Sequence, residues 1–99
     1  MTEQETVAKE FESVEVRVRN VLGLHARPAA KLSQEAQKFE SGITLVMNNK
    51  EVDAKSILDV LTLAAPQSCK LILKADGRDA REALERLGGM FDNRFGEEK

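Results

Sequence analysis

Four segments of the chain alternate between apolar and polar residues, as a strand with one buried face does. The first runs from Ser13 to Asn20, and its apolar positions are Val14, Val16 and Val18. The second is centred on Ile43, Leu45 and Met47, a short third lies around 51–53, and the fourth has Cys69, Leu71, Leu73 and Ala75 on its apolar face. The pair Asn48-Asn49 predicts a tight turn between the second and third strands.

Three further segments place apolar residues three or four positions apart, which predicts helices with one buried face. They extend from Ala26 to about Phe39, from Ser56 to just before Pro66, and from Asp79 onward. The element order is then β-α-β-β-α-β-α. Alternating strands and one-sided helices predict an α+β fold, a four-stranded antiparallel sheet with three helices on one face. We expect a single domain over 13–99 and a loose, charged leader over 1–12.

Local residue choices support the helix limits. Ser56 is followed three residues later by Asp59, as in a capping box. Asp79 is expected to cap the third helix, whose buried side carries Ala80, Ala83, Leu84 and Leu87. Gly88-Gly89 is expected to weaken its last turn.

Composition excludes several classes of function. The net charge of the 99 residues is -2, so the chain lacks the basic face that a nucleic-acid binder needs. No apolar run is long enough for a membrane span, and the polar start is unlike a signal peptide, so we expect a cytoplasmic protein. We also expect it to be a monomer. One cysteine and one histidine leave no metal cluster or disulfide framework, and no cofactor is expected. Cys69 is interpreted as a core residue.

The single histidine stands in the stretch GLHARPAAKL, at the start of the first predicted helix. An isolated histidine is more often a surface or structural residue, but the neighbours of His25 favour chemistry. First-turn backbone N–H groups lack intrahelical partners and attract anions. Pro28 fixes the backbone at the helix entry, and Arg27 adds a planar cation suited to phosphate oxygens.

This positive environment disfavours the imidazolium and keeps a ring lone pair for nucleophilic attack. The residues around His25 therefore predict a phosphoryl acceptor. A helix terminus contributes about 0.3–2 kcal/mol to a nearby anion, and a charge-assisted hydrogen bond about 1.5–3 kcal/mol. These energies orient a phosphoryl group without driving its transfer, so an activated donor must be brought by a partner protein.

GLHARPAAKL resembles the active-site segment of HPr, the histidine-containing phosphocarrier family of the bacterial phosphotransferase system, and AKSILDVLTLAAPQ resembles the family's regulatory serine and second helix. The resemblance implies an open-faced β-sandwich. It also implies that His25 accepts a phosphoryl group on Nδ1 from phosphorylated enzyme I and passes it to an enzyme IIA-type acceptor, with Arg27 accompanying the group. Such a protein is a stoichiometric carrier and not a turnover enzyme.

The second helix has apolar residues over more than half its circumference, more than a helix on a sheet can bury. Val60, Leu63 and Ala64 form one arc, and Ile57, Leu58 and Leu61 form the adjoining one. We interpret the second arc as a docking patch beside His25; the alternative is a fully packed helix. Ser56 is an N-cap by pattern, and its resemblance to the HPr kinase site implies regulatory phosphorylation.

Two features depart from the common family pattern. Asp59 and Ala64 stand where many members have glycine, and the tail GGMFDNRFGEEK resembles the nitrogen-related, regulatory branch. A regulatory HPr-like module, acting through protein binding and switched at Ser56, is therefore an alternative to the sugar-transport carrier. An unrelated α+β binding domain of ferredoxin-like organisation is a third, and it gives His25 no special role.

Overall fold

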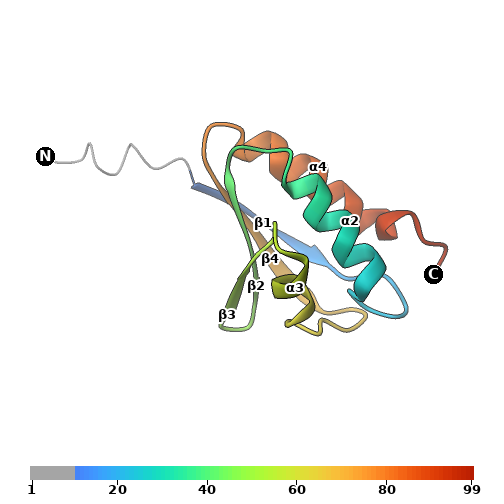
Figure 1. Ribbon diagram of the computed structural model, residues 1–99. Coiled ribbons are helices and arrows are strands. Elements are labelled where there is room, and N and C mark those ends of the chain that lie inside the picture. Colours follow the sequence, from blue (N-terminus) through green and yellow to red (C-terminus); the bar gives the residue numbers. More distant parts are fainter. Residues whose placement is uncertain (1–10) are drawn as a thin grey trace, which may run out of the picture.

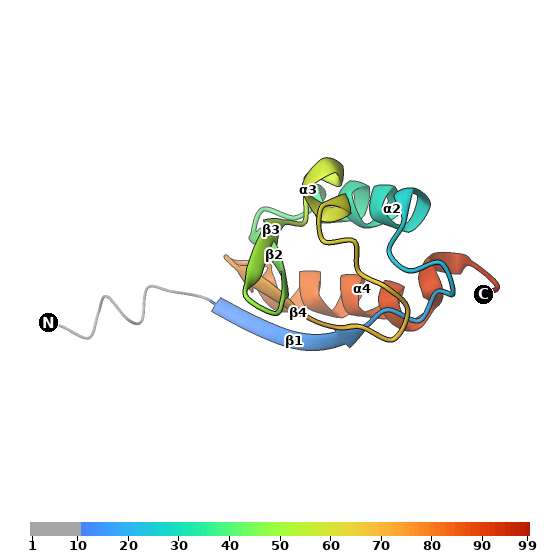
Figure 2. The ribbon, with the colours of Figure 1, turned by 90° about the horizontal axis from the view of Figure 1, so that it is seen from below.

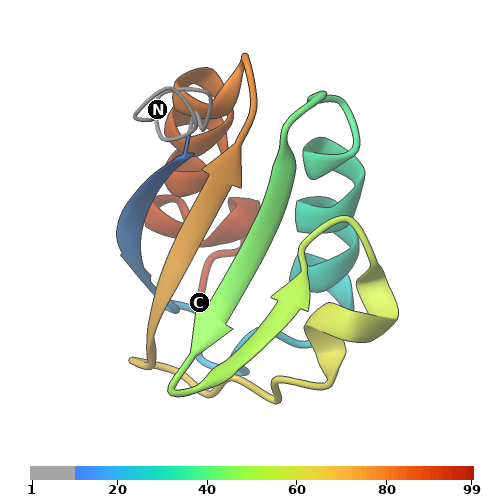
Figure 3. The ribbon, with the colours of Figure 1, turned by 90° about the vertical axis from the view of Figure 1, so that its left-hand side faces the viewer.

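The computed structural model describes residues 11–99, and these form two layers. Four antiparallel strands make one sheet in the order β1-β4-β2-β3, and the helices lie on one of its faces (Figures 1 and 3). The strands are β1 (Phe11–Arg17), β2 (Gly42–Met47), β3 (Lys50–Asp53) and β4 (Lys70–Asp76). The helices are α2 (Ala26–Ala36), α3 (Ile57–Leu61) and α4 (Ala80–Asp92), followed by the 3-10 turn η1 (Arg94–Gly96). The predicted sheet, helix number and element order are confirmed.

The core lies between the sheet and the helices, and it is built from the predicted apolar faces. In the register of the sheet, Val16 lies opposite Leu71, and Leu45 lies opposite Leu73. Leu32 of α2 and Leu87 of α4 close the core from the helical side, and both are fully buried. The other face of the sheet carries Ile72, which is 37% exposed. The sandwich is therefore open on that side.

Several predicted boundaries are wrong by a few residues. β1 begins at Phe11, two residues before the expected start, and ends at Arg17; the rest of the predicted leader lies outside the described residues. Val14 belongs to the apolar side of β1 but is 40% exposed. α2 ends at Ala36, before Phe39. α4 runs through Gly88-Gly89 to Asp92.

α3 has only five residues, whereas the sequence predicts a helix reaching almost to Pro66. Ser56 is its N-cap as predicted, and its Oγ accepts the N–H of Asp59 at 3.3 Å. The helix ends at Leu61, and Ala64 has a φ of 49°, which is left-handed backbone. Glycine adopts this conformation without a steric penalty, whereas the Cβ of alanine makes it less favourable. Ala64 is consequently exposed and does not share a buried face with Val60.

Asp79 does not cap its own helix, contrary to the prediction. Its carboxylate instead accepts the N–H groups of Glu40 and Ser41, both at 2.9 Å, and the hydroxyl of Ser41. The turn that precedes Asp79 passes close to Ser41. A Cβ on Gly77, whose φ is +151°, would lie 2.6 Å from Ser41 Oγ. Asp79 therefore clamps the α2–β2 connection to the start of α4.

We predict that this clamp gives the protein an acid-sensitive stability. The Ser41 hydroxyl and then the Glu40 N–H lower the pKa of Asp79 from 3.8 to about 2. A carboxyl whose pKa is lower in the folded state stabilises the fold above its unfolded pKa, and this contribution is lost as the pH falls through the folded value. Thermal unfolding between pH 3.8 and about 2 is expected to show a smaller loss of stability in Asp79→Asn than in wild type. Asp76→Asn is the control, and an unchanged pH profile in Asp79→Asn would contradict the clamp.

Candidate functional site

His25 is the N-cap of α2, so the predicted placement at a helix start is confirmed. Its backbone carbonyl accepts the N–H of Ala29 at 2.9 Å, and its side chain makes no capping hydrogen bond. The first-turn N–H groups of Ala26 and Arg27 are therefore not used by the imidazole, and Pro28 has none to offer. The His25 side chain is 29% exposed. The ring is accessible at the edge of the molecule and is not packed into the core.

The loop before His25 is held in place by the segment after α3. Leu24 donates its N–H to the carbonyl of Ala65 at 2.9 Å. Gly23 has a φ of +75°, and a Cβ at this position would lie 2.6 Å from the same carbonyl oxygen. Only glycine fits this close approach with left-handed backbone. The GLH part of the motif thus ties the histidine loop to the end of the α3 region.

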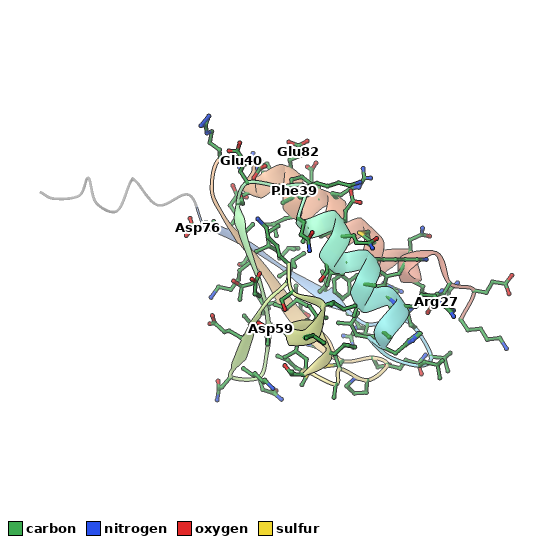
Figure 4. All side chains as sticks on the ribbon, in the orientation of Figure 1. Arg27, Phe39, Glu40, Asp59, Asp76 and Glu82 are labelled. Carbon is green, nitrogen blue, oxygen red and sulfur yellow. The ribbon has the colours of Figure 1, made fainter. Side chains whose placement is uncertain are left out.

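A carboxylate that the sequence analysis missed faces His25. Glu97 places Oε2 at 3.3 Å and Oε1 at 3.5 Å from His25 Nε2. Glu97 Oε2 also lies 3.7 Å from a guanidinium nitrogen of Arg27. The expectation of a purely positive environment is therefore wrong, because the C-terminal tail brings a negative charge to the ring. Figure 4 shows Arg27 at the same end of the molecule as this tail.

Buried contacts hold the tail against α2. The 3-10 turn has left-handed backbone at Arg94 and Phe95, each with a φ of 54°, which turns the chain back toward the helix start. Phe95 is 4% exposed and packs edge-on against Phe91, with ring centroids 4.9 Å apart. Lys31 of α2 donates to the carbonyl of Phe95 at 2.8 Å. Figures 1 and 2 both show the C-terminus and the start of α2 at the same end of the fold.

Asn20 connects the tail to the histidine loop. Its side chain is fully buried, and its amide nitrogen donates to the carbonyl of Arg94 at 2.8 Å and to Glu97 Oε1 at 2.6 Å. The hydrogen bond from Asn20 is the main cause of the lowered pKa of Glu97, whereas burial raises that pKa. His25 and Arg27 lower the pKa of Glu97 further. Glu97 is therefore a carboxylate at neutral pH.

The remaining predicted site residues are placed as follows. Arg27 is 72% exposed on its side chain, so it has room to move toward a bound anion. Ser56 is half-buried at the start of α3. Within the predicted docking patch, Leu58 is 72% exposed, whereas Ile57 and Leu61 are partly buried against the core.

Two exposed apolar residues lie beside His25, in the loop that joins the first strand to the first helix. Val21 is 53% and Leu22 is 76% exposed, and both line the shallow depression that contains His25 and Arg27.

No helix among residues 11–99 is both long enough and apolar enough to span a bilayer.

Comparison with known families settles the relationship of this chain. The family model described as "PTS HPr component phosphorylation site" matches residues 12–93. The chain belongs to the HPr family. It is 46% identical over 84 residues to the phosphocarrier protein HPr of Xylella fastidiosa (strain Temecula1), covering 85% of this chain and 94% of that protein. As an HPr-family member, it is related to the phosphocarriers of the phosphotransferase system.

Solved structures agree with this relationship. The crystal structure of HPr-C-His from Thermoanaerobacter tengcongensis matches with a TM-score of 0.85 and 41% identity, covering 89% of this chain and 99% of that one. The catabolite repression protein Crh of Bacillus subtilis, described as a domain-swapped dimer, matches with a TM-score of 0.69 and 42% identity, covering 79% of this chain and 90% of that one. The HPr fold therefore also occurs in Crh, a relative that is described as a dimer.

Proposed function

We propose that this chain is a phosphocarrier that accepts a phosphoryl group on Nδ1 of His25 from phosphorylated enzyme I and delivers it to an enzyme IIA-type acceptor. The observation that supports the proposal is the solvent-accessible His25 ring at the N-cap of α2, with its Nδ1 not engaged in capping. Such a carrier works in the cytoplasm, where phosphoenolpyruvate is the ultimate donor, and it acts as a monomer.

The proposed transfer is a nucleophilic displacement. The Nδ1 lone pair of His25 attacks the phosphorus carried by enzyme I, a new N–P bond forms, and the donor group leaves with the electron pair of the broken bond. The first-turn N–H groups and the exposed guanidinium of Arg27 would then donate hydrogen bonds to the phosphoryl oxygens on Nδ1. The reverse chemistry, with an enzyme IIA-type nucleophile, returns His25 to its starting state.

Incubating the protein with phosphoenolpyruvate and enzyme I tests this proposal. We expect a phosphoryl group to appear that is labile in acid and stable in alkali, as a phosphoramidate is, and to be passed on when an enzyme IIA-type protein is added. Absence of the label with active enzyme I would favour the regulatory module, which acts by binding alone. Retention of the label in the presence of several enzyme IIA-type acceptors would contradict the delivery step.

Leu58 is the centre of the proposed docking patch, with Ile57 and Leu61 at its inner edge. α3 packs beside α2, and the Ala65 carbonyl joins its trailing segment to the histidine loop. An exposed aliphatic side chain that becomes buried in a small interface contributes enough that Leu58→Ala is expected to weaken enzyme I binding by about tenfold. Titration calorimetry with Ile72→Ala as the control, an exposed apolar change on the opposite sheet face, checks this. Equal affinities of the two variants would exclude the patch.

Ser56 is proposed as a regulatory phosphorylation site. Its half-buried hydroxyl accepts only the N–H of Asp59, at 3.3 Å, among the contacts described for residues 11–99. A phosphate at this helix start adds negative charge beside Leu58 and changes docking without melting the helix. ATP and a purified HPr kinase are expected to label wild type and to spare Ser56→Ala. Equal labelling of both proteins would remove Ser56 from the account.

A further inference from the structure

We infer that Glu97 is a positioning residue that fixes the tautomer of His25, accepting the proton of Nε2–H so that Nδ1 keeps its lone pair for phosphoryl transfer. The inference rests on the proposed function for its biological meaning, but its structural content concerns the unphosphorylated protein alone. It gives the C-terminal tail, from η1 to Glu97, a role in the chemistry of the ring.

The geometry distinguishes the two ring nitrogens. Both carboxylate oxygens of Glu97 lie on the Nε2 side of His25, at 3.3 and 3.5 Å. A carboxylate only accepts hydrogen bonds, so it favours the tautomer whose proton is on Nε2. The other nitrogen, Nδ1, makes no capping bond to α2. The pairing therefore leaves the unprotonated nitrogen on the side of the ring away from Glu97.

Hydrogen bonds from Asn20 and Lys31 hold the carboxylate and its tail in this position. The buried amide of Asn20 donates to Glu97 Oε1 at 2.6 Å, which leaves Oε2 for His25 and Arg27. The same amide nitrogen holds the carbonyl of Arg94, and Lys31 holds that of Phe95. The left-handed backbone at Arg94 and Phe95 is strained for residues other than glycine, and such strain persists when surrounding contacts fix it. The tail is thus built to deliver one carboxylate to one ring nitrogen.

The experiment measures the tautomer directly. The ring nitrogens of ¹⁵N-labelled protein are recorded by two-dimensional NMR at a pH of about 8.5, above the ordinary range of histidine titration. In wild type we expect one pyrrole-like Nε2 and one pyridine-like Nδ1. In Glu97→Gln the ratio of the two tautomers is expected to fall by roughly threefold to tenfold, as a charge-assisted hydrogen bond is replaced by a neutral one.

The matched control is Glu98→Gln, which removes one negative charge from the next, exposed residue of the same tail. We expect its tautomer ratio to equal that of wild type. Unchanged ring shifts in Glu97→Gln would overturn the inference, and so would equal changes in both variants, since the effect would then be one of net charge. Glu97→Asp tests the geometry: its shorter side chain is expected to restore part of the ratio.

A second readout separates this inference from the phosphocarrier proposal. If enzyme I phosphorylates His25, Glu97→Gln is expected to lower the maximal transfer rate severalfold while leaving the KM for the protein unchanged, because the docking patch is intact. If wild type is not phosphorylated at all, the proposed function fails while the NMR result still decides the role of Glu97. A raised KM with an unchanged maximal rate would instead assign Glu97 to partner binding.

Discussion

Replacing His25 by alanine is expected to abolish phosphoryl transfer, reducing labelling by phosphoenolpyruvate and enzyme I to less than about one thousandth of the wild-type rate, because the nucleophile itself is removed. The protein is expected to stay folded. The His25 side chain is 29% exposed and makes no capping bond, so its loss leaves α2 intact. The helix start needs only the backbone carbonyl of His25, which accepts from Ala29.

The measurement is the mass of the protein after reaction, with circular dichroism as the folding control. His25→Gln is a useful companion, since it retains a polar side chain of similar length without an imidazole lone pair, and it is expected to be equally inactive. A mass gain of one phosphoryl group in folded His25→Ala would move the acceptor to another residue and refute the assignment.

The largest effect on stability is expected for Phe91→Ala, which should lower the free energy of unfolding by about 3–5 kcal/mol. Phe91 is fully buried in α4, and its ring is also the support of Phe95. Truncation removes apolar contacts and leaves a cavity that the sheet and α2 fill only in part. A loss of this size is a large fraction of the roughly 5–15 kcal/mol that stabilises an ordinary domain.

Urea denaturation followed by circular dichroism checks this value. Phe91→Leu, which keeps most of the apolar volume, is the matched control and is expected to cost less than half as much. A decrease below about 1 kcal/mol in Phe91→Ala would show that α4 does not depend on this side chain, in conflict with its burial.

The sheet and its helices were predictable because each depends on a local pattern. Alternation placed Leu71 and Leu73 on the buried face of β4, and the three-to-four spacing placed Leu32 and Leu87 on the buried sides of their helices. These assignments need only the periods of strand and helix. The sequence therefore predicts the buried faces of helices and strands better than their ends, because the ends depend on contacts made by the neighbouring loops.

The errors arise where a long-range contact or a left-handed backbone turn overrides the local pattern. Asp79 has the sequence position of a helix cap, but its carboxylate accepts the N–H groups of Glu40 and Ser41 instead of those of its own helix. The apolar run after Ser56 predicts a long helix, yet the left-handed turn at Ala64 redirects the chain. The local pattern of apolar positions reveals neither the Asp79 contacts nor the left-handed turn at Ala64.

His25 and Arg27 were identified from sequence because the motif is contiguous, whereas Glu97 lies 72 residues further along the chain. Its approach depends on two left-handed residues, on the burial of Phe95 and on the amide of Asn20. The aromatic residue after the last helix was the available signal, since it indicates that the tail packs against the fold. It does not indicate which acidic residue then faces the ring.

The most direct test of the phosphocarrier account is ¹⁵N and ³¹P NMR of the ¹⁵N-labelled protein after phosphorylation by enzyme I and phosphoenolpyruvate. We predict a single phosphorus resonance coupled to Nδ1 of His25, while Nε2 keeps its proton toward Glu97. Coupling to Nε2, or a phosphorus resonance from any residue other than His25, would contradict the account.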